Sequence, residues 1–209
     1  MLQFTGVEKF FGSVKVLSIP SLELPLAIYW LEGPNGSGKT TLLRVLAGIL
    51  PFRGQIRLRG ISLGREPTAY RRLTGWADAE PLYPDFLTGA DLLGFYRDII
   101  RPPAGQLDDL IGRFGVSSWL GSKAVTWSAG MCKKMSLLLA FMGRPALIML
   151  DEPLITLDRC GSTAVLDLVR ERYDKEGTAF ILSSHQPGLK REIPDLQRLI
   201  VHDGSIKLI

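Results

Sequence analysis

The stretch Leu31-Glu32-Gly33-Pro34-Asn35-Gly36-Ser37-Gly38-Lys39-Thr40-Thr41-Leu42-Leu43 decides the fold of this chain. Its residues Gly33 to Thr40 match G-x-x-x-x-G-K-[ST], the pattern of a loop that wraps around nucleotide phosphates. Glycines suit such a loop because they adopt positive φ, which lets backbone N–H groups turn toward an anion. In this pattern the lysine neutralises the β and γ phosphates and the threonine binds Mg²⁺. We therefore expect a nucleoside triphosphate to contact Gly33, Pro34, Asn35, Gly36, Ser37, Gly38, Lys39, Thr40 and Thr41.

The residues on both sides of the loop have the pattern that this motif requires. Leu26–Leu31 is an apolar run of strand length, as expected of a strand buried in a parallel sheet. After the loop, apolar residues recur at helical spacing from Leu42 to Ile49, and Gly48 and Pro51 are suited to end that helix. A glycine-rich turn without a ligand is the alternative, but the motif and its context together favour phosphate binding.

The length and composition of the chain are those of a globular domain. It has 209 residues, 46% of them hydrophobic, which is enough for a substantial core, and we expect one domain over 1–209. No apolar run approaches the roughly 18 residues of a membrane-spanning helix, and the first residues lack the basic start of a signal peptide. Cys132 and Cys160 are too few for a disulfide framework. These features predict a cytoplasmic protein.

The charge of the chain is mildly basic, with a net charge of +4 and an isoelectric point near 9.2. One interpretation is a solvated surface without a partner, and the other is attraction to anionic lipid at a membrane. The second rests on five arginines close together in the sequence: Arg57, Arg59, Arg65, Arg71 and Arg72. Dense runs of Lys and Arg with interleaved aromatic residues are missing from the sequence, so we expect no nucleic-acid partner.

Three segments with strand patterns flank the phosphate-binding stretch. Leu2–Val7 and Val14–Ile19 are expected to be strands joined through Gly12. Gly54–Gly60 alternates apolar and basic residues, as a strand with one wet face does. We expect these strands to form a small antiparallel sheet beside the base of the nucleotide.

Three helical patterns then follow one another without a strand between them. Thr88 is suited to cap the first, Pro102-Pro103 ends it, and a shorter helix carries Leu107 to Phe114. The third begins at about Ser128. Strands and helices then alternate again: strand 147–150, helix 163–173, strand 179–183 and a hairpin around 203–204. The predicted fold is α/β: a P-loop NTPase core with a parallel sheet, a small antiparallel β subdomain, and a helical subdomain inserted at about 88–143.

A second motif, which is acidic, follows the helical insertion. The buried strand pattern of Leu147-Ile148-Met149-Leu150 delivers Asp151 and Glu152 at its carboxyl end, where open α/β sheets bind ligands. Asp151 is expected to hold the Mg²⁺ already bound by Thr40, directly or through water. Glu152 is then placed to orient or deprotonate the attacking water. An ordinary strand that ends in an acidic turn is the alternative, which the upstream loop makes less attractive.

Together, these motifs and their order resemble an ABC-type ATPase, and more closely the ATP-binding subunit of an ABC transporter. The resemblance runs from Phe11 to His185 and rests on the phosphate-binding loop, Trp127-Ser128-Ala129-Gly130-Met131, Asp151-Glu152-Pro153, Leu157-Asp158 and Ser184-His185. It implies that Ser128, Ala129 and Gly130 form the signature that caps the γ-phosphate bound by a second subunit. It also implies that His185 contacts the γ-phosphate and that Asp158 lies in a loop facing the partner subunit. Phe11 stands where an aromatic ring stacks on adenine, although a core position is the alternative.

Two positions depart from the pattern of this family. Met131 replaces the glutamine that usually ends the signature. Alignment of Gly75–Pro81 with the loop that normally supplies a glutamine to Mg²⁺ places Ala79 at that glutamine, and Asp78 or Glu80 could supply an oxygen ligand in its place. Hydrolysis is therefore expected to be slow.

The resemblance implies an ATPase subunit that forms a dimer around two ATP molecules, with Mg²⁺, and powers a separate integral membrane permease. Such a subunit lies on the inner face of the membrane through its permease. The short chain and its motifs resemble the haem-exporter subunits of cytochrome c maturation, so we expect an exporter. Two alternatives are an ABC ATPase that acts on nucleic acid or as an assembly scaffold, and a P-loop kinase, which would leave Trp127–Gly130 unexplained.

Overall fold

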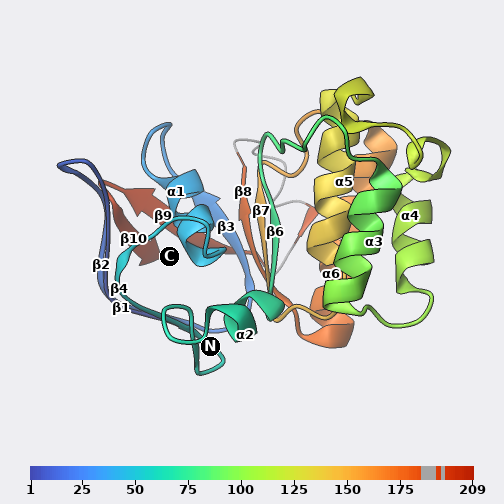
Figure 1. Ribbon diagram of the computed structural model, residues 1–209. Coiled ribbons are helices and arrows are strands. Elements are labelled where there is room, and N and C mark those ends of the chain that lie inside the picture. Colours follow the sequence, from blue (N-terminus) through green and yellow to red (C-terminus); the bar gives the residue numbers. More distant parts are fainter. Residues whose placement is uncertain (185–191, 194–195) are drawn as a thin grey trace.

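The computed structural model describes residues 1–184, 192–193 and 196–209 and has the α/β architecture expected from the sequence (Figure 1). In chain order its strands and helices are β1 (Leu2–Phe11), β2 (Val14–Leu24), β3 (Ile28–Glu32), α1 (Lys39–Leu46), β4 (Arg53–Leu58), β5 (Ile61–Ser62), α2 (Pro67–Arg72), β6 (Thr74–Ala77), α3 (Gly89–Ile100), α4 (Gln106–Phe114), the 3₁₀ helices η1 (Ser117–Trp119) and η2 (Ala124–Thr126), α5 (Ala129–Phe141), β7 (Leu147–Asp151), α6 (Arg159–Glu176), β8 (Ala179–Ser183), β9 (Gln197–His202) and β10 (Ser205–Leu208).

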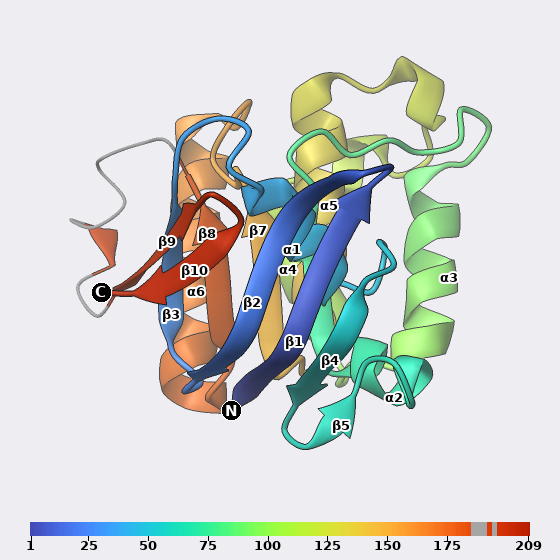
Figure 2. The ribbon, with the colours of Figure 1, turned by 90° about the vertical axis from the view of Figure 1, so that its left-hand side faces the viewer.

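The smaller sheet is antiparallel and has the strand order β2-β1-β4-β5. β1 lies in its middle and pairs with β2 on one side and β4 on the other. Figure 2 shows this sheet in front of the central one. The prediction of a small antiparallel sheet from three segments is confirmed, and β1 and β2 are longer than expected because their hairpin continues almost to the turn at Gly12.

The central sheet has the order β10-β9-β3-β8-β7-β6. Its strands are parallel from β9 to β6, and only β10 runs antiparallel, at the edge. β3 leads into the phosphate-binding loop and β7 ends at Asp151, and these strands flank β8, where Ser183 pairs with both Leu31 and Asp151. Because parallel strands end at the same edge, the loop and the acidic motif meet there.

Both faces of the central sheet are buried, which explains its continuous apolar strands. Met149 and Ile181 face α1 and the antiparallel sheet, whereas Ile148 and Phe180 face the layer of helices formed by α5 and its neighbours. Figure 1 shows α1 and the antiparallel sheet on one side and α3 to α6 on the other. Helices α3 to α5 lie between β6 and β7 in the chain, as the predicted insertion requires.

The sequence patterns did not predict helix α2 and strand β6, which lie between β5 and α3 in the chain. β6 has only four residues, too few to show a clear period, and its strand conformation depends on pairing with β7. At Gly75 a Cβ atom would lie 2.1 Å from the Ala140 carbonyl oxygen, so glycine lets β6 approach α5 closely. Both features are tertiary, and a local pattern does not reveal them.

Candidate nucleotide-binding site

The phosphate-binding loop between β3 and α1 has the backbone that its glycines predict. A Cβ atom at Gly33 would lie 2.4 Å from the carbonyl oxygen of Val201, so only glycine fits against β9. Gly38 precedes α1 as its N-cap with φ 103°, a conformation that favours glycine. The first turn of α1 therefore directs its free N–H groups toward the loop, where an anion can accept from them.

Lys39, the first residue of α1, is buried and points back across the loop. Its ammonium donates to the carbonyl oxygen of Gly33 at 2.7 Å and of Pro34 at 3.1 Å. These two carbonyl oxygens accept from two of the three N–H donors of the ammonium. They also hold the ammonium beside the space in which the β and γ phosphates are expected.

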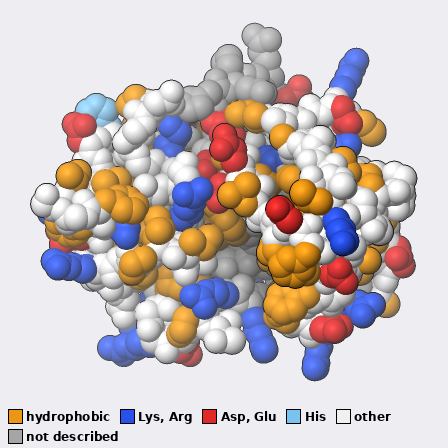
Figure 3. Space-filling view, turned by 45° about the horizontal axis from the view of Figure 1, so that its top comes forward, with side chains coloured by type: hydrophobic (Ala, Val, Ile, Leu, Met, Phe, Trp, Pro, Cys, Tyr) orange, Lys and Arg blue, Asp and Glu red, His pale blue; other side chains and the backbone are white. Residues whose placement is uncertain are grey.

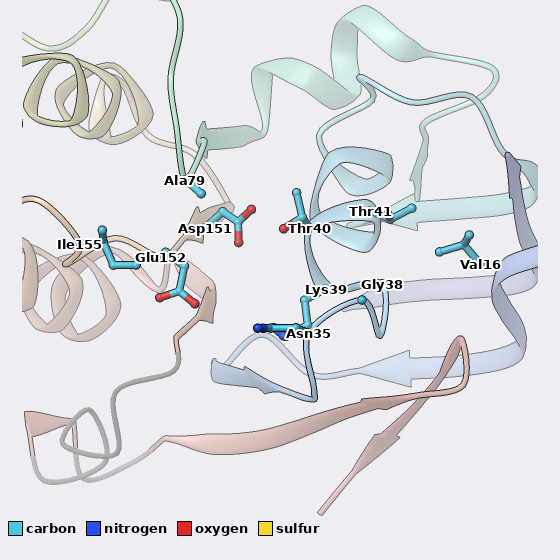
Figure 4. Close-up of a pocket in the computed structure, with 11 residues that line it drawn as sticks. Val16, Asn35, Gly38, Lys39, Thr40, Thr41, Ala79, Asp151, Glu152 and Ile155 are labelled. Carbon is cyan, nitrogen blue, oxygen red and sulfur yellow. The ribbon is translucent and has the colours of Figure 1, made fainter. Parts of the chain in front are cut away.

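A cavity of about 390 Å³ opens beside this loop, at the carboxyl edge of the central sheet. Figure 4 shows the Thr40 hydroxyl and the Asp151 carboxylate pointing toward one another across it, with Ala79 next to Asp151. The structure thus brings together the two motifs that the sequence places more than a hundred residues apart. The cavity is lined by Val16, Asn35, Gly36, Gly38, Lys39, Thr40, Thr41, Ala79, Asp151, Glu152 and Ile155.

Asp151 is almost completely buried and only one of its oxygens is satisfied. Oδ1 accepts from the Ser183 hydroxyl, whereas Oδ2 has no hydrogen-bond partner among the described residues. A buried carboxylate oxygen without a donor suits a hard cation, and Mg²⁺ commonly binds one or two protein oxygens together with phosphates and water. The described residues contain no group of three His, Cys, Asp or Glu side chains that could hold a metal by itself. The donor set of Thr40 and Asp151 therefore fits a Mg²⁺ ion that arrives with the nucleotide.

Glu152 follows directly in a strained backbone conformation. Its φ is 46°, which is unusual for a residue with a side chain and is typically found at functional sites. Its N–H donates to the Ser183 hydroxyl at 3.0 Å. The turn places the Glu152 carboxylate on the wall of the cavity, across from Lys39 (Figure 4).

Ala79 lies where the alignment predicts, on the wall of the cavity. The neighbouring Asp78 is not free to replace the missing glutamine, because both of its oxygens accept from Arg44 of α1 at 3.1 Å. Glu80 is exposed and does not line this cavity in the part of the chain that is described. The suggestion that Asp78 supplies the oxygen ligand is therefore not supported by its contacts.

The signature residues lie at the start of α5, outside this cavity. The Ser128 hydroxyl caps the helix and accepts from the Met131 N–H at 3.2 Å, and the Ser128 N–H points to the Met131 sulfur. Met131 thus takes the usual position of a capping-box glutamate or glutamine. Ser128 and Ala129 are exposed and Gly130 is partly exposed, so that a second molecule can reach them.

Three further residues were predicted to belong to the site: Asp158, Phe11 and His185. Asp158 caps α6 and binds Lys134 at 2.8 Å, and the Lys134 ammonium, together with the Gly161 N–H, lowers the pKa of the Asp158 carboxyl. Phe11 is 49% exposed at the end of β1, which excludes the alternative of a core position. His185 lies outside the described residues.

Three supporting residues were missed by the sequence reasoning. Ser183 holds both Asp151 and the backbone of Glu152, and Arg44 holds Asp78. Lys133 is completely buried in α5, and its ammonium donates to backbone carbonyls around the cavity. A lysine in an otherwise apolar helix face was the available signal for Lys133, since lysines are rarely buried without a partner.

A separate groove lies on the other side of the Asp78–Ala79 segment. It has a volume of about 200 Å³ and is lined by Trp76, Asp78, Pro81, Leu82, Tyr83, Tyr96, Ser136 and Leu139. Leu82 beside it is 93% exposed and Phe86 is 71% exposed. Figure 3 shows hydrophobic side chains on both halves of this face, with a dense group on the half that carries the helices. Among the described helices, none is long and apolar enough to cross a membrane.

The comparison with known families agrees with these motifs. The model of the family described as ABC transporter matches residues 24–155, from the end of β2 to the turn after Glu152. The chain belongs to the ABC transporter family. It is an ATP-binding cassette and an ATPase of that family, so the resemblance drawn from the sequence is confirmed.

The relatives of this cassette include ATP-binding proteins of both importers and exporters. It is 32% identical to an uncharacterized ABC transporter ATP-binding protein, YdbJ of Bacillus subtilis, over 99% of this chain and 68% of that protein. It is 31% identical to the cytochrome c biogenesis ATP-binding export protein CcmA of Pseudomonas syringae, over 74% of each chain. It is 30% identical to the zinc import ATP-binding protein ZnuC of Roseobacter denitrificans, over 99% of this chain and 76% of that protein.

Solved structures share the fold of the cassette. The ATP binding subunit of an ABC transporter superposes with a TM-score of 0.88 at 25% identity, covering 99% of this chain and 88% of that one. A dimeric, post-hydrolysis structure of the cassette MJ0796 with ADP and Pi has a TM-score of 0.84 at 17% identity, covering 99% of this chain and 97% of that one. The predicted fold class is thereby confirmed.

Proposed function

We propose that the cassette forms a dimer around two ATP molecules and powers a separate integral membrane permease. The proposed ATPase mechanism rests on one observation: Thr40, Asp151 and Glu152 line the same cavity beside the phosphate-binding loop. The observation that carries the dimer is the exposed signature at the start of α5, outside the cavity of its own chain. A dimer is also the state named for the related cassette MJ0796.

In the proposed mechanism the loop amides and Lys39 bind the phosphates, and Glu152 orients the attacking water and accepts its proton. Mg²⁺, held by Thr40 and Asp151, would neutralise charge that develops on the phosphate oxygens. Ser128 and Gly130 of a second subunit would donate to the γ-phosphate and so close the site from outside. In this arrangement both subunits contact the same γ-phosphate, so its cleavage from ATP lets the dimer open again. This opening movement drives the permease.

We place the permease on the groove beside Asp78–Ala79. Leu82 and Phe86 offer exposed apolar surface there, and large exposed apolar side chains commonly mark contact with another protein. This contact would hold the cassette on the inner face of the membrane. We propose export as the direction, from the similarity to the export protein CcmA.

Copurification from detergent-solubilised membranes tests the permease. A tagged cassette should retain one integral membrane protein, and Leu82→Asp should lose it, whereas Leu208→Asp at the far edge of β10 should keep it. ATPase activity of the free variants serves as the folding control. Retention of nucleic acid instead of a membrane protein, or equal retention by Leu82→Asp, would overturn this assignment. Uptake of substrate by inverted rather than right-side-out vesicles tests export.

A further inference from the structure

Lys133 is the most completely buried charged residue in the part of the chain that is described. It is 0% exposed, in α5, five residues after the signature serine. Its ammonium donates to the carbonyl oxygens of Asp151 at 2.7 Å, of Asp78 at 2.7 Å and of Ala79 at 3.3 Å. An ammonium has three N–H donors, and here all three have an acceptor.

The three acceptors match the charged form of this group. Only the ammonium form has three N–H donors, one for each of the three carbonyl oxygens. Desolvation lowers the pKa of Lys133 to about 8, while the nearby carboxylates of Asp151, Asp78 and Glu152 raise it.

One of these carbonyls belongs to the peptide bond that joins the two acidic residues of the site. The oxygen of that peptide, on Asp151, accepts from Lys133, and its N–H, on Glu152, donates to the Ser183 hydroxyl at 3.0 Å. Hydrogen bonds to its oxygen and from its N–H thus fix the plane of this peptide. The backbone angle φ of Glu152, directly after the peptide, is 46°. This conformation costs free energy and persists only where the surrounding structure enforces it.

We propose that Lys133 is a positioning residue for hydrolysis, which holds the Asp151–Glu152 peptide so that the Glu152 carboxylate faces the γ-phosphate. The proposal rests on the proposed role of Glu152. The other two acceptors, on Asp78 and Ala79, tie the segment between the cavity and the groove to the same ammonium. This tie is made through backbone atoms, so it does not need a side chain at Ala79.

The test compares Lys133→Met, Glu152→Gln and the double variant by single-turnover hydrolysis of Mg-ATP. Methionine fills the buried volume but offers no donor. Lys133→Met should lower the hydrolysis rate by about ten- to a hundredfold, because a misplaced catalytic group commonly loses that much. Its affinity for a fluorescent ATP analogue should stay close to that of the wild type. Lys175→Met, which removes an exposed lysine from α6, is the matched control and should match the wild type in both.

The double variant separates positioning from a general structural role. If Lys133 acts through Glu152, the double variant should be no slower than Glu152→Gln alone. Multiplication of the two losses, or a parallel loss of ATP affinity, would overturn the proposal. Should Lys133→Met fail to fold, Lys133→Gln, which keeps two donors, is compared in the same cycle and should fall between wild type and Glu152→Gln. Full activity of Glu152→Gln would instead refute the proposed role of Glu152.

Amide hydrogen exchange gives a readout that is independent of hydrolysis. Lys133→Met should accelerate exchange at residues 76–83 and at Glu152 in the nucleotide-free protein, because three carbonyl anchors are lost. Exchange in the antiparallel sheet should not change. Unchanged exchange at both places would contradict the anchoring on which the proposal depends.

Discussion

At the scale of single residues, the contacts of Lys39 hold its ammonium beside the phosphate-binding loop. Its ammonium rests on two carbonyls of its own loop, at 2.7 and 3.1 Å, and these are weaker partners than phosphate oxygens. The loop therefore holds the cation in place without neutralising it. Ser183 acts in the same way on the acidic side, since it binds one carboxylate oxygen of Asp151, while the other has no hydrogen-bond partner in the part of the chain that is described.

Lys39→Ala should weaken the binding of ATP. The change removes a charge-assisted contact of roughly 1.5–3 kcal/mol, so the Kd should rise by about ten- to a hundredfold. Titration with a fluorescent ATP analogue measures it, and Lys207→Ala on the exposed strand β10 is the control. Equal affinities of Lys39→Ala and the wild type would show that the ammonium does not contact phosphate.

Ala79→Gln should raise the basal rate of hydrolysis or lower the Mg²⁺ concentration that it requires. Ala79 lines the cavity next to Asp151, and its methyl group has no oxygen to offer a cation. Asp78 cannot take over because it is paired with Arg44. A missing polar contact of this kind typically costs about 1 kcal/mol, so the expected gain is about fivefold. Phosphate release at graded Mg²⁺ concentrations measures it.

The result for Ala79→Gln is read against two variants. Glu152→Gln should abolish most of the activity, because it removes the group that orients water. Ala79→Ser adds a shorter side chain, and it should change the rate less than Ala79→Gln. If Ala79→Gln alters neither the rate nor the Mg²⁺ requirement, the metal does not need a ligand from this position.

At the scale of elements, the helices inserted between β6 and β7 are defined by their ends. α3 begins with a capping box in which Thr88 accepts from the Asp91 N–H at 3.1 Å and Asp91 accepts from the Thr88 N–H at 2.9 Å. α4 ends at Gly115, which has φ 63° and so suits glycine. These caps satisfy terminal backbone groups and set where each helix can pack.

Thr88→Ala should destabilise the cassette by about 1 kcal/mol at neutral pH, because it removes the N-cap side chain of α3. Chemical denaturation followed by circular dichroism measures this difference. Ser117→Ala, at an exposed 3₁₀ turn without a side-chain cap bond, is the control and should change stability little. A difference near zero for Thr88→Ala would mean that water replaces the cap.

The capping box at the start of α3 also predicts that the stability of the fold depends on pH. Hydrogen bonds from the Thr88 side chain and backbone lower the pKa of Asp91 below its ordinary value of 3.8. A carboxyl whose pKa is lower in the folded state stabilises the fold above its unfolded pKa, and this contribution is lost as the pH falls through the folded pKa. The stability difference between wild type and Thr88→Ala should therefore shrink below about pH 4. Denaturation midpoints at pH 7, 5 and 3 check the sign.

At the scale of the whole molecule, the signature and the cavity lie on different parts of one chain. Ser128 begins α5 in the helical layer, whereas Lys39 and Thr40 begin α1 on the opposite face of the central sheet. A γ-phosphate bound by one copy can therefore meet the signature of another, which is the basis of the proposed dimer. Asp158, which caps the start of α6 and binds Lys134, is proposed to face the partner subunit.

Glu152→Gln should accumulate as a dimer with Mg-ATP, because it retains the binding loop but hydrolyses slowly. Size-exclusion chromatography with light scattering measures the mass with and without Mg-ATP. The double variant Lys39→Ala/Glu152→Gln should stay monomeric, since it lacks the phosphate contact that closes the dimer. A Glu152→Gln protein that stays monomeric with ATP bound would mean that the permease or another chain is needed for dimerisation.

Much of the fold and of the site could be predicted from local patterns. The phosphate-binding loop, the strand ending in Asp151-Glu152 and the three helices between them each have a period or motif within a few residues. The turn of the last hairpin, Asp203-Gly204, was also correct, and both residues have positive φ as a tight turn requires. β6 was missed because its four residues take their conformation from pairing with β7 and packing on α5 rather than from their own sequence. α2 was missed because its six residues are too few to show a helical period.

Residue types and their spacing were enough to predict the chemistry: a lysine and glycines for phosphates, a threonine and an aspartate for Mg²⁺, and a glutamate for water. These depend on residue type and spacing, which a motif records. Only the tertiary structure reveals that one Asp151 carboxylate oxygen has no hydrogen-bond partner among the described residues. It also reveals that Asp78 is bound by Arg44 and that Lys133 donates to the carbonyl oxygen of Asp151. These contacts join residues far apart in the chain. They form only when packing brings buried polar groups together and leaves each one needing a partner.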